Sequence, residues 1–411
     1  MRILLLVDNY YPSTKSVAKM MRDLALELVR LGHDVKVAAA ADDLQQKVSV
    51  SREDGTTVLR VNTGGLKINA RALRGWRESR LSARMWRGGK NFFHDNPCDL
   101  IIFYSPSIFF GALVQKLKKL WKCPSYLVHR DIFPRWALDA GVLKPGLVYN
   151  FLRRKELEHY DASDLIGVET PGNLRYFAEE LGHKNYPLEV LVNWANMAEK
   201  PSPGDSRLRH ELGLGGKVVF FYGGNIGVAQ DMDNIFRLAA SVRDHENIFF
   251  LLVGSGSEVE RLNAEIARRA LPNIRILPPV PQQEYLPCVA QFDVGLISLD
   301  RRLKTNSLTG KLLGYLQCGM PVLASLNPGN DVGTFLRDSE AGIACENGDD
   351  AGLRAAALLL AGNPELRRRM GANARALGET KFSVHAAAMQ IMSHFTREKA
   401  ASACNAKGAA R

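Results

Sequence analysis

Short apolar runs alternate with helical patterns along this chain, and the series begins twice. The first run is Arg2–Asp8, and a second series opens with Val218–Tyr222. Each run has the length of a buried strand, and the segments between runs place apolar residues three and four apart, which is typical of helices. Strands that alternate with helices build parallel sheets covered by helices on both faces. The sequence therefore predicts an α/β chain of two Rossmann-like, doubly wound domains, with the carboxyl strand ends facing a central cleft.

The domain boundaries follow from composition. Residues 195–207 are rich in Pro, Ser and Gly and have the character of a linker. We therefore expect an N-terminal domain at 1–196 and a C-terminal domain at 197–380. We expect a helix at 381–398 that packs back toward the N-terminal domain, and a disordered tail at 399–411. Both domains can form a full core, because 46% of the 411 residues are hydrophobic.

Cysteine spacing and hydropathy indicate the compartment. The six cysteines are scattered without Cys-x-x-Cys spacing, which argues against a zinc site and against a disulfide framework. No apolar run has the length of a transmembrane helix, and no secretory leader opens the chain. We therefore expect a cytoplasmic protein. The first strand is not followed by G-x-G-x-x-G, which argues against a dehydrogenase.

Positive charge is concentrated in one part of the chain. The net charge is +11, and between Arg60 and Lys122 there are thirteen Lys and Arg residues against three acids. Segment 67–90 repeats arginine every three or four residues beside Trp76 and Trp86, which predicts a cationic amphipathic helix. Such a helix would lie on an anionic membrane surface, here the inner membrane, or bind a polyphosphate lipid. The alternative is a solvated face whose arginine stems cover a core. No nucleic-acid motif accompanies the charge.

Three turns in the second domain have the composition of a phosphate site. They lie at Gly223–Gly227, at Gly254–Ser257, and in the stretch 305–324, where a loop leads into a helix and then a strand. Backbone amides of glycine turns and helix N-termini bind phosphates, and Lys311 adds charge. We therefore predict a nucleotide-diphosphate site; the alternative is an ordinary loop–helix–strand unit. The predicted donor-binding residues are Gly224, Asn225, Gly227, Gln230, Gly254, Gly256, Val280, Ser307, Thr309 and Lys311.

No metal motif accompanies this site. Asp231-Met-Asp233 has the letters of a D-x-D motif but opens a helix, where acidic residues favour capping and the helix dipole. We therefore expect a site that needs neither a metal nor another cofactor.

Several stretches together resemble a known family. They are Asp8–Ser13, Arg130–Pro134, Glu169–Asn173, Val192–Trp194, Tyr222–Gln230, Val253–Gly256 and Gly310–Ala324. The chain resembles a GT-B glycosyltransferase of the large retaining family numbered four, in the branch that adds fucosamine- or fucose-type sugars to bacterial surface polysaccharides. The similarity extends from Asp8 to Ala324 and so includes both predicted domains.

The resemblance implies the reaction and its partners. It implies transfer, with retention, of a sugar such as an N-acetylated deoxy-amino sugar from a UDP-linked donor. The acceptor would be lipid-linked or lipopolysaccharide, as in O-antigen biosynthesis. The implied catalytic residues are Asp131, His129 and Lys311, and the implied acceptor-binding residues are Tyr11, Ser13, Arg130 and Glu169. The alternative for Asp131 is a helix cap, and for His129 packing at a strand end.

Two departures from the family pattern keep other functions open. Many relatives have a glutamate pair where this chain has Asn306 and Gly314, and an Arg and a Lys where Asn225 and Gln230 stand. A nucleotide-sugar epimerase and a catalytically weak nucleotide-sugar-binding protein therefore remain alternatives.

Overall fold

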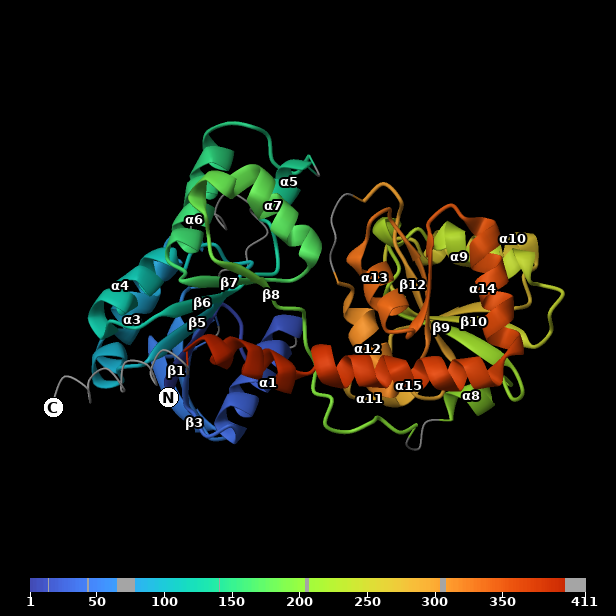
Figure 1. Cartoon of the computed structure of the whole chain (residues 1–411), viewed down its shortest axis with the longest axis horizontal. Helices are drawn as coiled ribbons and strands as arrows, with labels where there is room; N and C mark the ends of the chain where they lie inside the picture. The colour runs from blue at the N-terminus through green and yellow to red at the C-terminus, as the bar shows by residue number, and fades with distance from the viewer. Residues whose placement is uncertain are drawn as a thin grey trace. The chain divides into compact units, whose positions relative to one another are not determined.

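The computed structural model describes residues 1–13, 15–42, 44–64, 78–139, 141–203, 207–303 and 308–395. The chain divides into two compact units (Figure 1). Unit 1 consists of Met1–Val192 together with the segment from Val384 onward, and unit 2 is Asn193–Ser383. The predicted boundaries, 196/197 and 380/381, lie within four residues of these divisions, and the predicted tail at 399–411 lies outside the described residues.

Unit 1 contains an eight-stranded sheet of order β3-β4-β2-β1-β5-β6-β7-β8. Its strands are β1 (Arg2–Val7), β2 (Asp34–Ala41), β3 (Val48–Glu53), β4 (Thr56–Asn62), β5 (Leu100–Tyr104), β6 (Ser125–Val128), β7 (Leu165–Val168) and β8 (Leu188–Val190). All neighbours are parallel except β3 and β4, which form an antiparallel hairpin. The strand order reverses between β1 and β5, so this is the switch point of unit 1.

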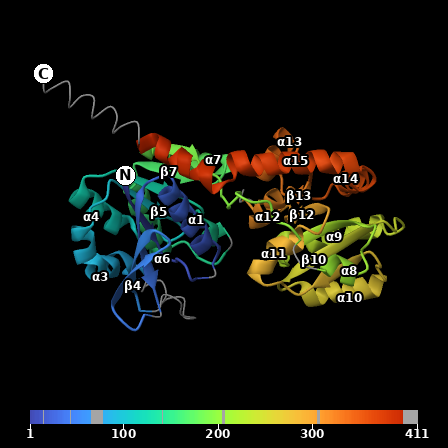
Figure 2. The same cartoon turned by 90° about the horizontal axis from the view of Figure 1, so that it is seen from below.

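Helices lie on both faces of this sheet (Figure 2). The helices of unit 1 are α1 (Ser16–Arg30), α3 (Leu81–Asp95), α4 (Gly111–Trp121), α5 (Arg135–Asp139), α6 (Leu147–Asp161) and α7 (Pro171–Leu181), followed by the 3-10 turn η1 (Gly182–Lys184). Side chains of α3, α4, α6 and α7 share one buried cluster with Leu4 and Leu6 of β1. A terminal helical segment, 384–395, contacts the strands through Phe395 against Tyr126 and through Gln390, which donates to the Val190 carbonyl.

Unit 2 contains a six-stranded parallel sheet of order β11-β10-β9-β12-β13-β14. Its strands are β9 (Val218–Asn225), β10 (Ile248–Ser255), β11 (Ile274–Leu277), β12 (Val294–Ser298), β13 (Val322–Leu326) and β14 (Gly342–Glu346). The order reverses between β9 and β12. In open α/β sheets, ligands bind at the carboxyl ends of the strands where the order reverses.

The helices of unit 2 also divide between the two faces. They are α8 (Leu208–Glu211), the 3-10 turn η2 (Val228–Gln230), α9 (Met232–Ser241), α10 (Val259–Arg269), α11 (Gln282–Val289), α12 (Gly310–Cys318), α13 (Asp331–Asp338), α14 (Asp350–Gly362) and α15 (Pro364–Lys381). Helices α9, α10 and α14 share a buried cluster with Phe220 and Phe250. On the opposite face, Phe292 stacks on Phe221, with ring centres 5.1 Å apart.

The prediction of two doubly wound α/β domains is confirmed, with two differences. The sequence interpretation omitted the β3–β4 hairpin, although its turn, Asp54-Gly55, is a typical hairpin signal with positive φ at both residues. It also omitted α13 and β14. None of the helices within the described ranges is long and apolar enough to span a membrane.

Candidate functional site

Glycines at the ends of β9 and β10 allow two backbones to approach closely. A Cβ on Gly254 would lie 1.8 Å from the Gly224 carbonyl oxygen, and one on Gly256 would lie 2.1 Å from that of Ile226. Gly224 itself has φ +130°, a conformation that L side chains rarely adopt. Only glycine fits these positions, so the two strand ends form a tight turn region at the switch point of unit 2.

Lys311 lies over this turn. Its Cε would be 3.3 Å and its Nζ 3.7 Å from a Cβ on Gly224, and Nζ is 4.7 Å from the centre of the Tyr222 ring. The side chain is half-buried, and burial lowers the pKa of Lys311 to about 8. Within the described part of the chain, no acidic side chain pairs with its ammonium group. The cation is therefore held partly desolvated, without a counter-charge, beside the glycine turn.

The start of α12 adds further unpaired polar groups. Thr309 occupies the N-cap position, yet its hydroxyl does not cap the helix. That hydroxyl is buried and lacks a hydrogen-bond partner among the residues that the structure describes. The first amides of a helix also lack carbonyl partners within the helix. Thr309, Lys311 and the first turn of α12 therefore offer donors and positive charge to an anion. Ser307 and Asn306 lie outside the described residues.

Tyr315 fixes the position of α12, and the sequence interpretation gave it no role. Its hydroxyl accepts a hydrogen bond from the Gly223 amide (3.3 Å) and lies 3.0 Å from the carbonyl oxygen of Leu296. The β9–β12 pairing includes Gly295↔Phe221 and does not extend to Gly223. The Tyr315 hydroxyl therefore provides hydrogen bonds to the Gly223 amide and the Leu296 carbonyl at the point where β9 and β12 no longer pair. A signal was available, because a tyrosine one turn after Lys311 lies on the same face of the helix.

Gly314 is one of the two positions where relatives have a glutamate. A Cβ there would lie 3.2 Å from the Tyr285 ring, and a Cβ on Gly223 would lie 2.7 Å from the same ring. Tyr285, on α11, thus occupies the space beside the two glycines. A glutamate at position 314 would require the Tyr285 ring to move. The packing of this ring against Gly314 therefore differs from the packing that a glutamate at this position needs.

The remaining predicted donor-binding residues are arranged as follows. Asn225 donates to the Gln230 side-chain oxygen (2.8 Å), which also accepts from the Gly227 amide (3.1 Å). These two side chains therefore stabilise the loop after β9, and the amide of Gly227 is no longer free. Val280 is half-buried in the loop between β11 and α11.

The two carboxylates of Asp231-Met-Asp233 contact other side chains of unit 2. The Asp231 carboxylate accepts from Asn347 (2.8 Å) and does not cap α9, so the capping prediction is wrong for this residue. Asp233 forms an ion pair with Arg261 (3.0 Å). In the described ranges, no group of three or more His, Cys, Asp or Glu side chains could hold a metal ion.

In unit 1, His129 lies in the core. It is 1% exposed and packs between Tyr160 and Phe177. The Tyr160 hydroxyl donates to Glu156 (2.8 Å), so the 3.0 Å contact to His129 requires the Nε2–H tautomer of the histidine. Burial, and secondarily the charge of Arg130, lower the pKa of His129 to about 3. This environment corresponds to the packing alternative, in which a neutral His129 does not touch a substrate.

Arg130 and Asp131 follow at the carboxyl end of β6. The Arg130 guanidinium is buried and donates to the carbonyls of His129 (2.8 Å) and Val192 (3.3 Å). Asp131 is exposed, lies four residues before the start of α5, and makes no hydrogen bond or ion pair within the described residues. Surrounding protein atoms nevertheless raise the pKa of the Asp131 carboxyl through desolvation. This carboxylate is free to contact a ligand.

Asp8 and Tyr104 lie at the switch point of unit 1, directly after β1 and at the end of β5. One Asp8 oxygen is buried without a partner in the described part of the chain, and burial raises the pKa of Asp8. Burial raises the pKa of the Tyr104 hydroxyl above its ordinary value; the charge of Arg130 opposes this shift, and those of Asp8, Asp131 and Glu169 add to it. Glu169 is 5% exposed. The sequence interpretation did not select Asp8 or Tyr104 as site residues.

Tyr11 and Ser13 lie in the loop after β1. The Tyr11 ring is 49% exposed, and the Arg22 guanidinium lies over it, 4.4 Å from its centre. Ser13 donates its amide to the Tyr10 carbonyl (3.0 Å). Both residues are accessible, so the loop can contact a ligand at this end of the sheet.

Comparisons with protein families match both halves of the chain. Residues 16–194 match the glycosyl transferase 4-like domain, and residues 206–377 match the glycosyl transferases group 1 model. The chain therefore contains the two domains of a GT-B glycosyltransferase, and this is the class of protein that the fold and the family matches define. The predicted GT-B fold class is confirmed.

Two curated relatives match at low identity. WbjE of Pseudomonas aeruginosa, named as a glycosyltransferase, is 26% identical over 230 residues, which is 55% of this chain and 57% of that protein. WcaI of Escherichia coli K12, named as a glycosyl transferase of colanic acid biosynthesis, is 24% identical over 382 residues, which is 84% of this chain and 86% of that protein.

Solved structures match across nearly the whole chain. Sucrose-phosphate synthase from Thermosynechococcus elongatus has a TM-score of 0.71 at 16% identity and aligns with 97% of this chain and 99% of its own. Anabaena Alr3699/HepE, solved in complex with UDP and glucose, has a TM-score of 0.66 at 17% identity and aligns with 97% of this chain and 100% of its own. At these identities the likeness shows the fold alone.

Proposed function

We propose that this protein transfers a sugar from a UDP-linked donor to a lipid-linked or lipopolysaccharide acceptor, with retention, in the synthesis of a bacterial surface polysaccharide. The donor sugar is an N-acetylated deoxy-amino sugar. The observation that carries the proposal is the position of Lys311 over Gly224 at the switch point of unit 2. The name of WcaI as a colanic acid transferase and the UDP complex of the Anabaena protein support the choice of acceptor class and nucleotide.

The arrangement at Lys311 suits a diphosphate leaving group. When the bond between the sugar and the diphosphate breaks, negative charge builds on the departing phosphate oxygen. An ammonium and helix amides that are already in position stabilise that charge without reorganising. The Thr309 hydroxyl, which has no hydrogen-bond partner among the described residues, donates to the same anion. The acceptor hydroxyl attacks from the face that the diphosphate leaves, and its proton passes to the leaving phosphate oxygen, so no protein nucleophile is needed.

The groups of unit 1 are proposed to hold the acceptor. Asp131 and Glu169 accept hydrogen bonds from acceptor hydroxyls, and Asp131 orients the attacking one. Arg130 is buried against backbone carbonyls and supports this strand end, while Tyr11 and Ser13 contact the acceptor at the loop after β1. His129, neutral and packed on Tyr160, positions the backbone of Arg130 and Asp131 rather than exchanging protons with the substrate.

The basic segment 67–90 is proposed to hold the protein peripherally on the inner-membrane surface, where lipid-linked acceptors are present. Residues 67–77 of this segment lie outside the described residues. Arg87 and Lys90, on α3, are exposed.

The test is a panel of nucleotide sugars screened by thermal stabilisation, followed by transfer assays with membrane extract as acceptor. Ligands that bind the native state raise the melting temperature, so the cognate donor is identified before an acceptor is known. Lys311→Ala is expected to weaken UDP binding about 10- to 100-fold, the loss of one charge-assisted contact. Lys217→Ala removes a lysine before the opposite end of β9 and is the matched control.

The assay also separates the alternatives. Interconversion of the free nucleotide sugar without transfer would identify an epimerase. Binding without turnover, even with membrane extract, would identify a nucleotide-sugar-binding protein. If no uridine nucleotide stabilises the protein, or if Lys311→Ala and Lys217→Ala bind UDP equally, the proposed donor site is wrong.

A further inference from the structure

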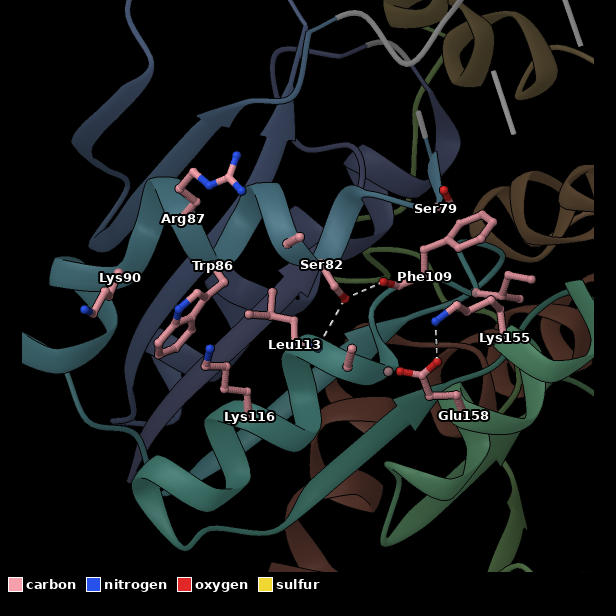
Figure 3. Close-up of a pocket in the computed structure, with 14 residues that line it drawn as sticks. Ser79, Ser82, Trp86, Arg87, Lys90, Phe109, Leu113, Lys116, Lys155 and Glu158 are labelled. Carbon is pink, nitrogen blue, oxygen red and sulfur yellow. Dashed lines mark hydrogen bonds and ion pairs between the residues drawn. The ribbon is translucent and has the colours of Figure 1, made fainter. Parts of the chain in front are cut away.

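A cavity of about 490 Å³ lies on unit 1, away from the strand ends that form the proposed acceptor site. It is bounded by α3, α4 and α6 (Figure 3). These helices cover one face of the sheet, whereas Asp8, Tyr104, Asp131 and Glu169 lie at the carboxyl ends of its strands. The proposed donor and acceptor sites therefore do not use this cavity, although Arg87 and Lys90 of its lining also belong to the basic segment 67–90.

The rim of the cavity is cationic. Arg87 and Lys90 reach it from α3, and Lys116 reaches it from α4; all three are exposed. Within the described ranges, none of the three has an acidic partner at ion-pair distance. The one carboxylate in the lining, Glu158, is already paired with Lys155 at 2.6 Å. Three cations without an ion-pair partner among the described residues thus line one cavity, which favours an anionic ligand.

The wall of the cavity is apolar and aromatic. Trp86 is half-buried, with the Lys116 ammonium 4.1 Å from the centre of its ring. Phe109 and Leu113 are 5% and 1% exposed and contribute to the same lining. Ser82 donates to the Phe109 carbonyl and accepts from the Leu113 amide (3.1 Å), so this hydroxyl is already used. A free phosphate would meet only the rim, whereas a ligand with an anionic head and an apolar stem would meet both rim and wall.

We propose that this cavity binds the head group of one anionic membrane lipid. The phosphate lies among Arg87, Lys90 and Lys116, and the first carbons of the lipid chains lie against Trp86 and Phe109. Aromatic rings with neighbouring lysines and arginines are typical of protein surfaces at the membrane interface. The inference rests on the proposed function only in placing the protein at a membrane. It adds a single defined lipid site on α3 and α4 to the general attraction of the basic segment.

Charge reversal in the full-length protein tests the rim. The probe is cosedimentation with vesicles of phosphatidylglycerol and phosphatidylcholine, with pure phosphatidylcholine as the uncharged reference. Arg87→Glu with Lys116→Glu is expected to lower binding to the anionic vesicles by about 30-fold or more, since each basic residue near such a surface contributes about 1 kcal/mol. The matched control is Lys119→Glu with Arg175→Glu, which changes the charge of exposed residues of unit 1 outside the cavity. Equal losses in the two double variants would overturn the proposal in favour of diffuse attraction.

Filling the cavity tests the site without changing its charge. Ala112 is exposed on α4 and lines the cavity, so Ala112→Phe is expected to reduce vesicle binding about tenfold while leaving every rim cation in place. Ala178→Phe, on the exposed face of α7, is the control for adding a ring to the surface. Undiminished vesicle binding by Ala112→Phe would overturn the proposal.

Two further measurements separate this site from other ligands and from the transferase reaction. Excess soluble glycerol phosphate should not displace the protein from vesicles; full displacement would mean a phosphate site rather than a lipid site.

UDP binding is measured on every variant. Loss of vesicle binding with unchanged UDP affinity is the expected result, and loss of both would show a structural defect and overturn the assignment. If the parent protein binds no UDP, the proposed transferase function fails while the vesicle result still decides the lipid site.

Discussion

The Lys311 side chain lies across Gly224, close enough that a methyl group on residue 224 would contact its Cε at 3.3 Å. The two residues come from different elements, α12 and β9, and meet because the strand order reverses between β9 and β12. The glycine leaves room for the Lys311 side chain directly above a strand end. Because burial has already removed part of the water around the ammonium, an anion binding here displaces less solvent than it would at an exposed lysine.

The first prediction concerns pH. Burial lowers the pKa of Lys311 to about 8, so the ammonium form predominates below that pH and is lost as pH rises. Both UDP phosphates are fully ionised above about pH 7.5, because the second phosphate pKa is near 6. UDP affinity should therefore fall between pH 8 and pH 9.5, by up to about tenfold per pH unit. Titration calorimetry checks this. Lys311→Met should bind more weakly and show a flat profile; a parallel decline in the variant would assign the titration to another group.

Asp131→Asn is expected to lower kcat for sugar transfer by about 10²-fold, because the amide orients the acceptor hydroxyl less well than the carboxylate and a misplacement of about 1 Å can cost that much. UDP affinity should not change, because the residue belongs to unit 1. Glu179→Gln removes another exposed carboxylate of the same unit and should leave kcat intact. Steady-state kinetics with the acceptor found in membrane extract provide the measurement. An unchanged kcat would transfer the orienting role to Glu169 or Asp8.

The sequence was most informative where a local pattern decides the structure. Glycines that follow an apolar run predict a turn at a strand end, and Gly224, Gly254 and Lys311 lie where that pattern puts them. The hairpin of β3 and β4 had an equally local signal at Asp54-Gly55, which the interpretation overlooked.

Packing over long sequence distances could not be predicted in the same way. Asp8 and Tyr104 become neighbours only because β1 pairs with β5. The burial of His129 depends on Tyr160 of α6 and Phe177 of α7, and no spacing near position 129 indicates those contacts. Tyr315 lies in the stretch 305–324, but its role depends on where β9 and β12 separate.

Gly254→Ala should destabilise unit 2 strongly. Its Cβ would lie 1.8 Å from a backbone oxygen, which cannot move without breaking the β9–β10 pairing. Overpacking of this kind costs about 1–3 kcal/mol, and more where backbone must shift. Gly362→Ala at the exposed end of α14 meets no atom within 4 Å and should be neutral or stabilise by a few tenths of a kcal/mol. Thermal melts of the two variants give the comparison; similar melting temperatures would show that the close approach of the two strand ends is incorrect.

The last prediction concerns acid stability of unit 1. His159 is fully buried against Phe103, with both ring nitrogens unpaired among the described residues, and burial lowers its pKa to about 3. The unfolded chain protonates this histidine near pH 6.5, so the unfolded state binds more protons and stability falls as pH drops from about 6.5 toward 3. The contribution of His159 to the free energy of unfolding changes by about 1.4 kcal/mol per pH unit in this window.

His159→Leu should therefore lose less stability than the parent between pH 7 and pH 5, by about 2 kcal/mol. His183→Gln, at an exposed position, should follow the parent. Urea unfolding followed by tryptophan fluorescence reports mainly unit 1, because four of the five tryptophans belong to it. Identical pH profiles for the parent and His159→Leu would mean that this histidine is not held neutral in the core.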